Sequence, residues 1–205
     1  MFKILSYGCC ALDYGGAFYA TPWVRPENVR GRAGSPVIVG WIRSSPMELH
    51  IAPVSWDFPR PFTLAVTPRD DDIDGLNHTN NAVYVQWCGQ IGWAHSQALG
   101  LGLADYRRLD RAMAIRRGAY DYLLPTLAGE ELTLATWLTA SDGKLTMERR
   151  FQLVRQRDGA TVLRARWDLV CIELSSGRAR RMPNEFCEVY LPAQVSPSDT
   201  PAPVR

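Results

Sequence analysis

A fold of the α+β class is predicted for this chain, with a five-stranded antiparallel sheet wrapped around one long central helix. Residues 81–99 have the three- and four-residue apolar spacing of a helix and contain no Asp, Glu, Lys or Arg. Five other segments alternate apolar and polar residues, as half-buried strands do. A twisted sheet curled around one apolar helix is a compact way to bury that helix.

The central helix is expected from Asn81 to Leu99. Asn80 is a suitable N-cap, because its side-chain oxygen can accept a hydrogen bond from an amide of the first turn, and Gly100 and Gly102 end the helix. A helix without charged side chains is not expected at a surface, so the sheet should largely wrap it. The apolar positions of this helix are Tyr84, Trp87, Cys88, Ile91, Ala94, His95 and Ala98, extended around the axis by Val83, Val85 and Trp93.

The strands are expected at residues 61–67, 113–122, 131–139, 145–155 and 161–173. The last four should form an antiparallel meander, because turn residues separate each of them from the next. These turn residues are Pro125 and Gly129, then Asp142-Gly143, then Asp158-Gly159.

The domain organisation is expected to have three parts. Residues 1–60 read as a weakly ordered extension or appended arm, because prolines interrupt every element longer than the strand-like run at 37–42. Met47 is an alternative start within this segment. Residues 61–192 form the folded domain, and residues 193–205 read as a disordered tail rich in proline.

The composition indicates an ordinary globular protein of 205 residues with a net charge of +2, which does not suggest a nucleic-acid partner. No apolar run approaches the length needed to cross a bilayer, and the N-terminal apolar stretch is too short for a secretory signal, so we expect a cytoplasmic protein. The five cysteines and three histidines have no metal-like spacing. Buried or incidental thiols are therefore expected, with no metal and no cofactor.

Residues 72–87 resemble the D-x-D-x-x-x-H-x-N-N-x-x-Y-x-x-W signature of hotdog-fold thioesterases, in particular the 4-hydroxybenzoyl-CoA and acyl-ACP thioesterase group. The stretches Tyr122-Leu123-Leu124-Pro125, Gly129-Glu130 and Arg181-Met182-Pro183 are similar to later parts of that family's pattern. The resemblance covers about residues 61–190. It implies a hotdog fold, hydrolysis of acyl-CoA or acyl-ACP thioesters in fatty acid metabolism, and a homodimer or dimer of dimers with the active site between subunits.

The sequence also departs from the family pattern. Asn77 stands where many relatives have glycine before the histidine, and Leu76 stands where plant acyl-ACP enzymes have asparagine. Gly89 and Gln90 occupy places where relatives often carry two glutamates. Because the helix then has no acid, a mechanism with a helix-borne carboxylate is disfavoured, which leaves Asp74 as the catalytic candidate.

Asp74 is expected in the loop before the helix N-terminus, where it could act as general base for water or attack the thioester carbonyl itself. A turn or capping role is the alternative for Asp74 alone, but the complete signature favours catalysis. The amides of Asn80 to Ala82 are expected to be free and to form an oxyanion hole, aided by the helix dipole. Asp72 is expected to close the loop through hydrogen bonds.

The other candidate site residues have catalytic, substrate-binding or structural interpretations. His78 could orient substrate or tune Asp74, or pack at the start of the helix. Asn80 is expected as a cap that also positions the oxyanion amides, and Asn81 could bond the Asp74 loop or the substrate. His95 is expected to be a satisfied core histidine, and Tyr84 and Trp87 to belong to the core.

Four arginines are expected to be exposed, where they could contact coenzyme A phosphates or an acidic carrier protein, although solvated strand faces explain them equally well. These are Arg149, Arg155, Arg164 and Arg166. Two other functions stay open. A hotdog hydratase would need a helix-borne acid that this helix lacks, and an acyl-CoA-binding module would bind thioesters without releasing thiol.

Overall fold

The computed structural model describes residues 54–196. The expected strand at 37–42, the alternative start at Met47 and most of the expected C-terminal tail lie outside the described residues. The elements in chain order are β1 (Phe62–Val66), η1 (Asp70–Asp72), α1 (Asn81–Ala98), α2 (Leu103–Leu109), β2 (Arg111–Tyr122), β3 (Leu132–Ser141), β4 (Thr146–Arg155), β5 (Thr161–Glu173) and α3 (Asn184–Tyr190).

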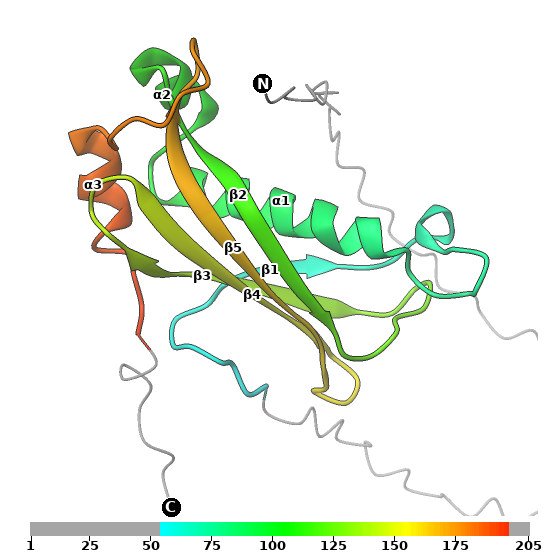
Figure 1. The fold of residues 1–205 in the computed structure, drawn as a ribbon. Coiled ribbons are helices and arrows are strands. Elements are labelled where there is room, and N and C mark those ends of the chain that lie inside the picture. The colour runs from blue at the N-terminus through cyan, green and yellow to red at the C-terminus, as the bar shows by residue number, and fades with distance from the viewer. Residues whose placement is uncertain (1–53, 197–205) are drawn as a thin grey trace, which may run out of the picture. The chain divides into compact units, whose positions relative to one another are not determined.

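The fold is the expected hotdog arrangement of a five-stranded antiparallel sheet packed around a long helix, with strand order β1-β3-β4-β5-β2. Figure 1 shows α1 lying along the curved sheet, with α2 and α3 at one end. The prediction of a four-strand meander was wrong, because β2 pairs with β5 and not with β3. The strand β3 has β1 on one side and β4 on the other, so β5 offers the free edge that β2 takes.

The helix α1 begins and ends close to the expected residues. The Asn80 side chain accepts from the Ala82 amide at 2.9 Å, and Gly100 follows the helix at a positive φ of 98°. One face of α1 packs on the sheet, but Val85 and Trp93 are 38% and 46% exposed. The expectation of a largely wrapped helix was therefore too strong, because a single sheet covers only one face of it.

The core lies between α1 and the sheet, where alternate residues of the strands meet the inner face of the helix. Phe151 on β4 and Trp167 on β5 contact each other edge-to-face, with ring centroids 4.7 Å apart. Cys88 and Cys171 are buried free thiols in this core, as the isolated positions of these cysteines suggested. Among the described residues, no helix is long and apolar enough to span a membrane.

Packed chain extends beyond residues 61–192 at both ends. Trp56 and Phe58 contact the Trp137 ring on the outer side of β3. Val195 is 6% exposed, and its amide donates to Leu138 O at 2.9 Å. The outer face of the sheet is thus partly covered by segments that the sequence pattern assigned to the extension and the tail.

The short helices α2 and α3 were not predicted, because seven residues give too little periodicity to recognise. They pack against each other through Tyr106, Phe186 and Tyr190. The hydroxyls of Tyr106 and Tyr190 are hydrogen-bonded, and Tyr190 also donates to Ser96 Oγ on α1 at 3.0 Å. These contacts cover the C-terminal end of α1.

Replacement of a core aromatic residue should measure the contribution of the helix–sheet contact. Phe151 is 2% exposed, so Phe151→Ala is expected to lower the free energy of unfolding by about 3–5 kcal/mol in chemical denaturation. Val85→Ala on the outer face of α1 is the control and should change it by less than about 0.5 kcal/mol. Equal effects of the two substitutions would contradict this location of the core.

Candidate active site

The loop that precedes α1 is closed by backbone hydrogen bonds. Asp74 N donates to His78 O at 2.8 Å, and Ile73 and Thr79 form an isolated antiparallel bridge. Asn77 in the bend has a φ of 60°, a left-handed conformation that asparagine tolerates better than most residues. Asp72 accepts from Arg69 N at 2.9 Å, which is the loop-closing role expected for it. The loop therefore holds residues 74–78 in a defined conformation.

The Asp74 carboxylate is partly used by this loop and partly free. Its Oδ1 accepts from Leu76 N at 2.8 Å and from His78 N at 3.4 Å. Its Oδ2 has no hydrogen-bond partner within residues 54–196, and Asp74 forms no ion pair there. Both roles expected for Asp74 are compatible with this geometry, since one oxygen holds the turn and the other is available.

The amides at the start of α1 are not all free, so the expectation for them was partly wrong. Asn80 N donates to Asp72 O at 2.8 Å, and Ala82 N donates to Asn80 Oδ1 at 2.9 Å. Only the Asn81 amide among these three lacks a hydrogen-bond partner in the part of the chain that the structure describes. The N-cap hydrogen bond occupies the Ala82 amide, and the hydrogen bond that closes the loop occupies the Asn80 amide.

Asp74, His78 and Asn81 line one open groove of about 270 Å³ at the N-terminus of α1, together with Tyr84 and Tyr122. The His78 ring is exposed and has no hydrogen bond among the described residues. Asn80 does not line this groove, and its side chain serves as the helix cap. The structure thus brings three of the four predicted site residues together and gives the fourth a structural role.

Tyr122 and Thr126 form hydrogen bonds around the groove and were not among the predicted site residues. Tyr122 donates to Asn81 O at 3.3 Å, and its place in the Tyr-Leu-Leu-Pro stretch was the available signal. The buried Thr126 hydroxyl lies 2.8 Å from Tyr84 Oη and donates to Thr79 Oγ1 at 2.7 Å. Nothing local in the sequence marks Thr126. Its network ties the loop before α1 to the loop after β2, and it places Tyr84 in both the core and the groove wall.

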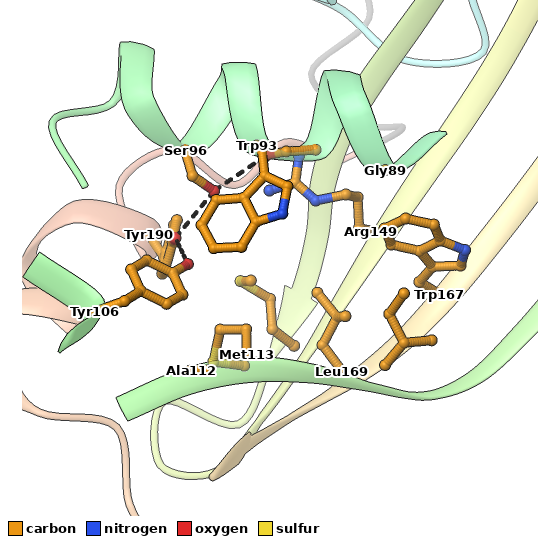
Figure 2. Close-up of a pocket in the computed structure, with 13 residues that line it drawn as sticks. Gly89, Trp93, Ser96, Tyr106, Ala112, Met113, Arg149, Trp167, Leu169 and Tyr190 are labelled. Atoms are coloured by element: carbon orange, nitrogen blue, oxygen red, sulfur yellow. Dashed lines mark hydrogen bonds between the residues drawn. The ribbon is translucent and has the colours of Figure 1, made fainter. Parts of the chain in front are cut away.

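Arg149 is not exposed, contrary to the sequence-based expectation. It is 3% exposed and lies on the helix-facing side of β4, in a pocket beneath α1 that Trp93 and Trp167 also line (Figure 2). The other three arginines pair with acids of the chain, which weakens a role in contacting phosphates. These pairs are Arg155 with Asp158, Arg164 with Asp57, and Arg166 with Asp168.

His95 accepts a hydrogen bond from Arg149, as expected for a satisfied core histidine. Arg149 Nη1 lies 3.0 Å from His95 Nδ1, and the His95 ring stacks on Phe62. Burial, and secondarily the positive charge of Arg149, lower the pKa of His95 to about 4. The ring is therefore neutral near pH 7 and serves as an acceptor.

Among residues 54–196, no group of three His, Cys, Asp or Glu side chains is placed to hold a metal ion.

Comparisons with known proteins agree with the fold. The model of the thioesterase-like superfamily matches residues 66–189. No curated protein sequence matches this chain. Among solved structures, a hypothetical protein from Staphylococcus aureus in complex with CoA is similar with a TM-score of 0.60 and 17% identity, over 71% of this chain and 96% of that one.

Two further similar structures have named activities. The 1,4-dihydroxy-2-naphthoyl-CoA thioesterase from Synechocystis gives a TM-score of 0.56 at 18% identity, over 62% of this chain and 95% of that one. The 12:0-ACP thioesterase from Umbellularia californica gives 0.61 at 17% identity, over 71% of this chain and 53% of that one. These identities are low, so the likeness is one of fold.

The lowered pKa of His95 predicts a pH dependence of stability. Its folded-state value of about 4 lies below the ordinary 6.5, so the unfolded chain takes up the proton first as the pH falls. This contribution is complete above about pH 6.5 and is lost towards pH 4. Between pH 7.5 and pH 5, the wild type should lose about 2 kcal/mol more unfolding free energy than His95→Asn, which keeps an acceptor for Arg149. Equal losses in denaturation curves would show that His95 titrates normally.

Proposed function

The chain belongs to the thioesterase-like superfamily, and we propose that it is a thioesterase that hydrolyses an acyl-CoA thioester in the groove at the N-terminus of α1. The observation that carries this proposal is the presence of Asp74 and Asn81 in one groove. There, Asp74 Oδ2 and the Asn81 amide both lack partners among the described residues. A thioester needs a base or nucleophile and a donor for the developing oxyanion, and this groove offers one of each.

The proposed reaction can follow two routes. As general base, Asp74 takes a proton from water while the water oxygen bonds to the carbonyl carbon. The tetrahedral intermediate then breaks the C–S bond, and the thiolate leaves and takes up the proton. As nucleophile, Asp74 itself displaces the thiolate to form an anhydride, which water hydrolyses to the acid and free Asp74. In both routes the Asn81 amide, at the positive end of the helix dipole, stabilises the oxyanion.

His78 and Asn80 have supporting roles in this proposal. The exposed His78 ring lines the groove beside Asp74, where it can contact the substrate or the attacking water. Asn80 holds the first turn of α1 through its cap and thereby orients the neighbouring Asn81 amide. Asn80 is a positioning residue.

The carrier of the acyl group is proposed to be coenzyme A first and acyl carrier protein second. A similar structure was solved with CoA bound, and another is an acyl-ACP thioesterase, which supports this order only by likeness. A hydratase is disfavoured because α1 has no acidic residue to pair with a histidine. No catalytic metal or redox cofactor is required by either route.

We also propose that two copies of the chain associate through β2. This strand has 12 residues and pairs only with β5 among the described strands, and a long free edge is a template for further pairing. Two β2 strands that pair antiparallel about their midpoint would bring Met113 of one copy opposite Tyr120 of the other. This would place the pocket of Arg149 in one copy beside the groove of Asp74 in the other, because β2 contributes to both.

The role of Asp74 can be tested without loss of the loop. In Asp74→Asn the amide oxygen can still accept from Leu76 N and His78 N, but the basic oxygen is replaced by an amide nitrogen. The substitution is expected to reduce kcat for acyl-CoA hydrolysis about a hundredfold or more, measured by the release of free thiol.

The control for this test is Asp71→Asn, in the same acidic run but outside the groove, which should keep full activity. Near-normal turnover of Asp74→Asn would remove Asp74 from the mechanism. If the wild type binds acyl-CoA of any chain length but releases no thiol, the chain is a binding module.

The association through β2 predicts a molar mass in solution of at least twice that of the chain. Light scattering coupled to size-exclusion chromatography, over a hundredfold range of protein concentration, measures it directly. A monomer at all concentrations would contradict the proposed pairing. The groove of each chain would then have no second copy beside it.

A further inference from the structure

A second cavity, of about 150 Å³, lies beneath the C-terminal half of α1 and has no lining residue in common with the groove of Asp74. It exists because α1 has glycine at positions 89 and 92. A Cβ on Gly92 would lie 3.6 Å from the Trp167 ring and 3.9 Å from Arg149 Cδ, whereas a Cβ on Gly89 would meet nothing within 4 Å. Figure 2 shows Trp93, Met113 and Leu169 among the residues around this space. Most of its wall is therefore apolar or aromatic.

Arg149 in this cavity is a buried cation without a carboxylate partner. It is 3% exposed, and within residues 54–196 no acid lies within ion-pair distance of it. Only Nη1 has hydrogen-bond partners there, which are His95 Nδ1 at 3.0 Å and Thr136 Oγ1 at 3.3 Å. Nε and Nη2 have none, yet they are not among the fully enclosed unsatisfied atoms. These two nitrogens are thus unpaired and not fully enclosed, in a side chain that lines the cavity.

The surroundings of Arg149 supply dipoles but no negative charge. Burial lowers the pKa of Arg149 to about 10, so the guanidinium is still charged at neutral pH. Burial raises the pKa of Tyr106, so its hydroxyl is neutral and cannot act as a counter-ion. The hydroxyls of Ser96 and Tyr190 also line the cavity, and α1 has no acid. A buried charge left without a partner is costly, and an anionic ligand would offset that cost.

We propose that this cavity binds the far end of the substrate's acyl group, and that this end carries a carboxylate that pairs with Arg149. Two adjacent guanidinium N–H groups match the two oxygens of a carboxylate, which makes arginine the preferred residue for such recognition. The acyl group would then be that of an ω-carboxyacyl or carboxyaryl thioester.

The size of the cavity limits the body that carries the carboxylate. A cavity of about 150 Å³ in another protein holds a benzene molecule, so this one suits a single ring or a chain of about six carbons. A long alkyl chain would not fit. The indole rings of Trp93 and Trp167 provide aromatic surface for either body.

This inference rests on the proposed thioester hydrolysis, and on the pairing through β2 that would bring the cavity of one copy beside the groove of another. A binding experiment separates the two proposals because it needs no hydrolysis. Benzoate and benzamide have the same shape and differ in charge, so their dissociation constants for the wild-type protein can be compared by calorimetry. We expect benzoate to bind at least about tenfold more tightly than benzamide.

Three variants locate the binding. Arg149→Met should abolish the preference for benzoate. Arg150→Met is the matched control, because Arg150 follows on the same strand and pairs with Glu148 outside the cavity, and it should keep the preference. Gly89→Leu should fill the cavity, keep α1 folded because leucine favours helix, and abolish benzoate binding with Arg149 intact.

Hydrolysis then tests whether the ligand is the substrate's acyl group. Adipoyl-CoA and heptanoyl-CoA have acyl chains of similar length, and only the first ends in a carboxylate. The wild type should show a kcat/KM at least about tenfold higher for adipoyl-CoA, and Arg149→Met should reverse this order.

The outcomes are distinct. Equal binding of benzoate and benzamide, or equal effects of Arg149→Met and Arg150→Met, would overturn the anion site. Binding of benzoate through Arg149 with no preference for adipoyl-CoA would overturn the substrate assignment. It would show that the site binds a free carboxylic acid and not the acyl group of the substrate. Release of thiol from no thioester, with benzoate binding intact, would overturn the proposed hydrolysis and leave the anion site standing.

Discussion

The packing of one face of α1 on the curved sheet is the contact on which the remaining structure depends. That face is wholly uncharged, and Cys88 and Ile91 in its centre are fully buried. Because the helix is held along its length, its two ends have fixed positions relative to the strands. The N-terminal end meets the loop that contains Asp74, and the C-terminal half lies over Arg149. One buried helix thus positions both candidate parts of the site.

The groove of Asp74 and the cavity of Arg149 have opposite electrostatic character. At the N-terminus, Asp74 is half-buried and its loop leaves one carboxylate oxygen and one helix amide without partners among the described residues. Beneath the other end, Arg149 is deeply buried with a single bonded nitrogen. Departures from complete pairing of polar groups are uncommon in a folded core and concentrate where a protein binds or reacts with something. Here, the unpaired groups at Asp74 and Asn81 line the groove, and the unpaired nitrogens of Arg149 line the cavity.

The isolated chain exposes large apolar side chains of the kind that an assembly of chains usually buries. Val85 is exposed on the outer face of α1, Trp93 in the cavity wall is 46% exposed, and Ile115 on β2 is 52% exposed. The strand β2 contributes residues to both the groove and the cavity, so the proposed association through its free edge would bring together the two halves of a substrate site. The β-bulge between Ile115 and Arg117 shifts the register of the β2–β5 pairing and places Arg117 opposite Asp168 on β5.

The sequence by itself determined the elements whose signals are local. Apolar periodicity and the Asn80 cap set α1 to within one residue, and alternation set β5 to its observed bounds. The spacing of Asp74, His78 and Asn81 around the start of the helix placed all three in one groove, because short-range hydrogen bonds hold that loop.

Tertiary structure decided what depends on contacts distant in sequence. The pairing of β2 with β5, the packing of α2 on α3 and the Thr126 network all join residues far apart in the chain, so no local pattern shows them. Arg149 follows the alternation of Met147 and Phe151 towards the core, but the usual exposure of charged residues argued against that place. The space for the Arg149 side chain exists because α1, which packs above it, has Gly89 and Gly92 in place of larger residues.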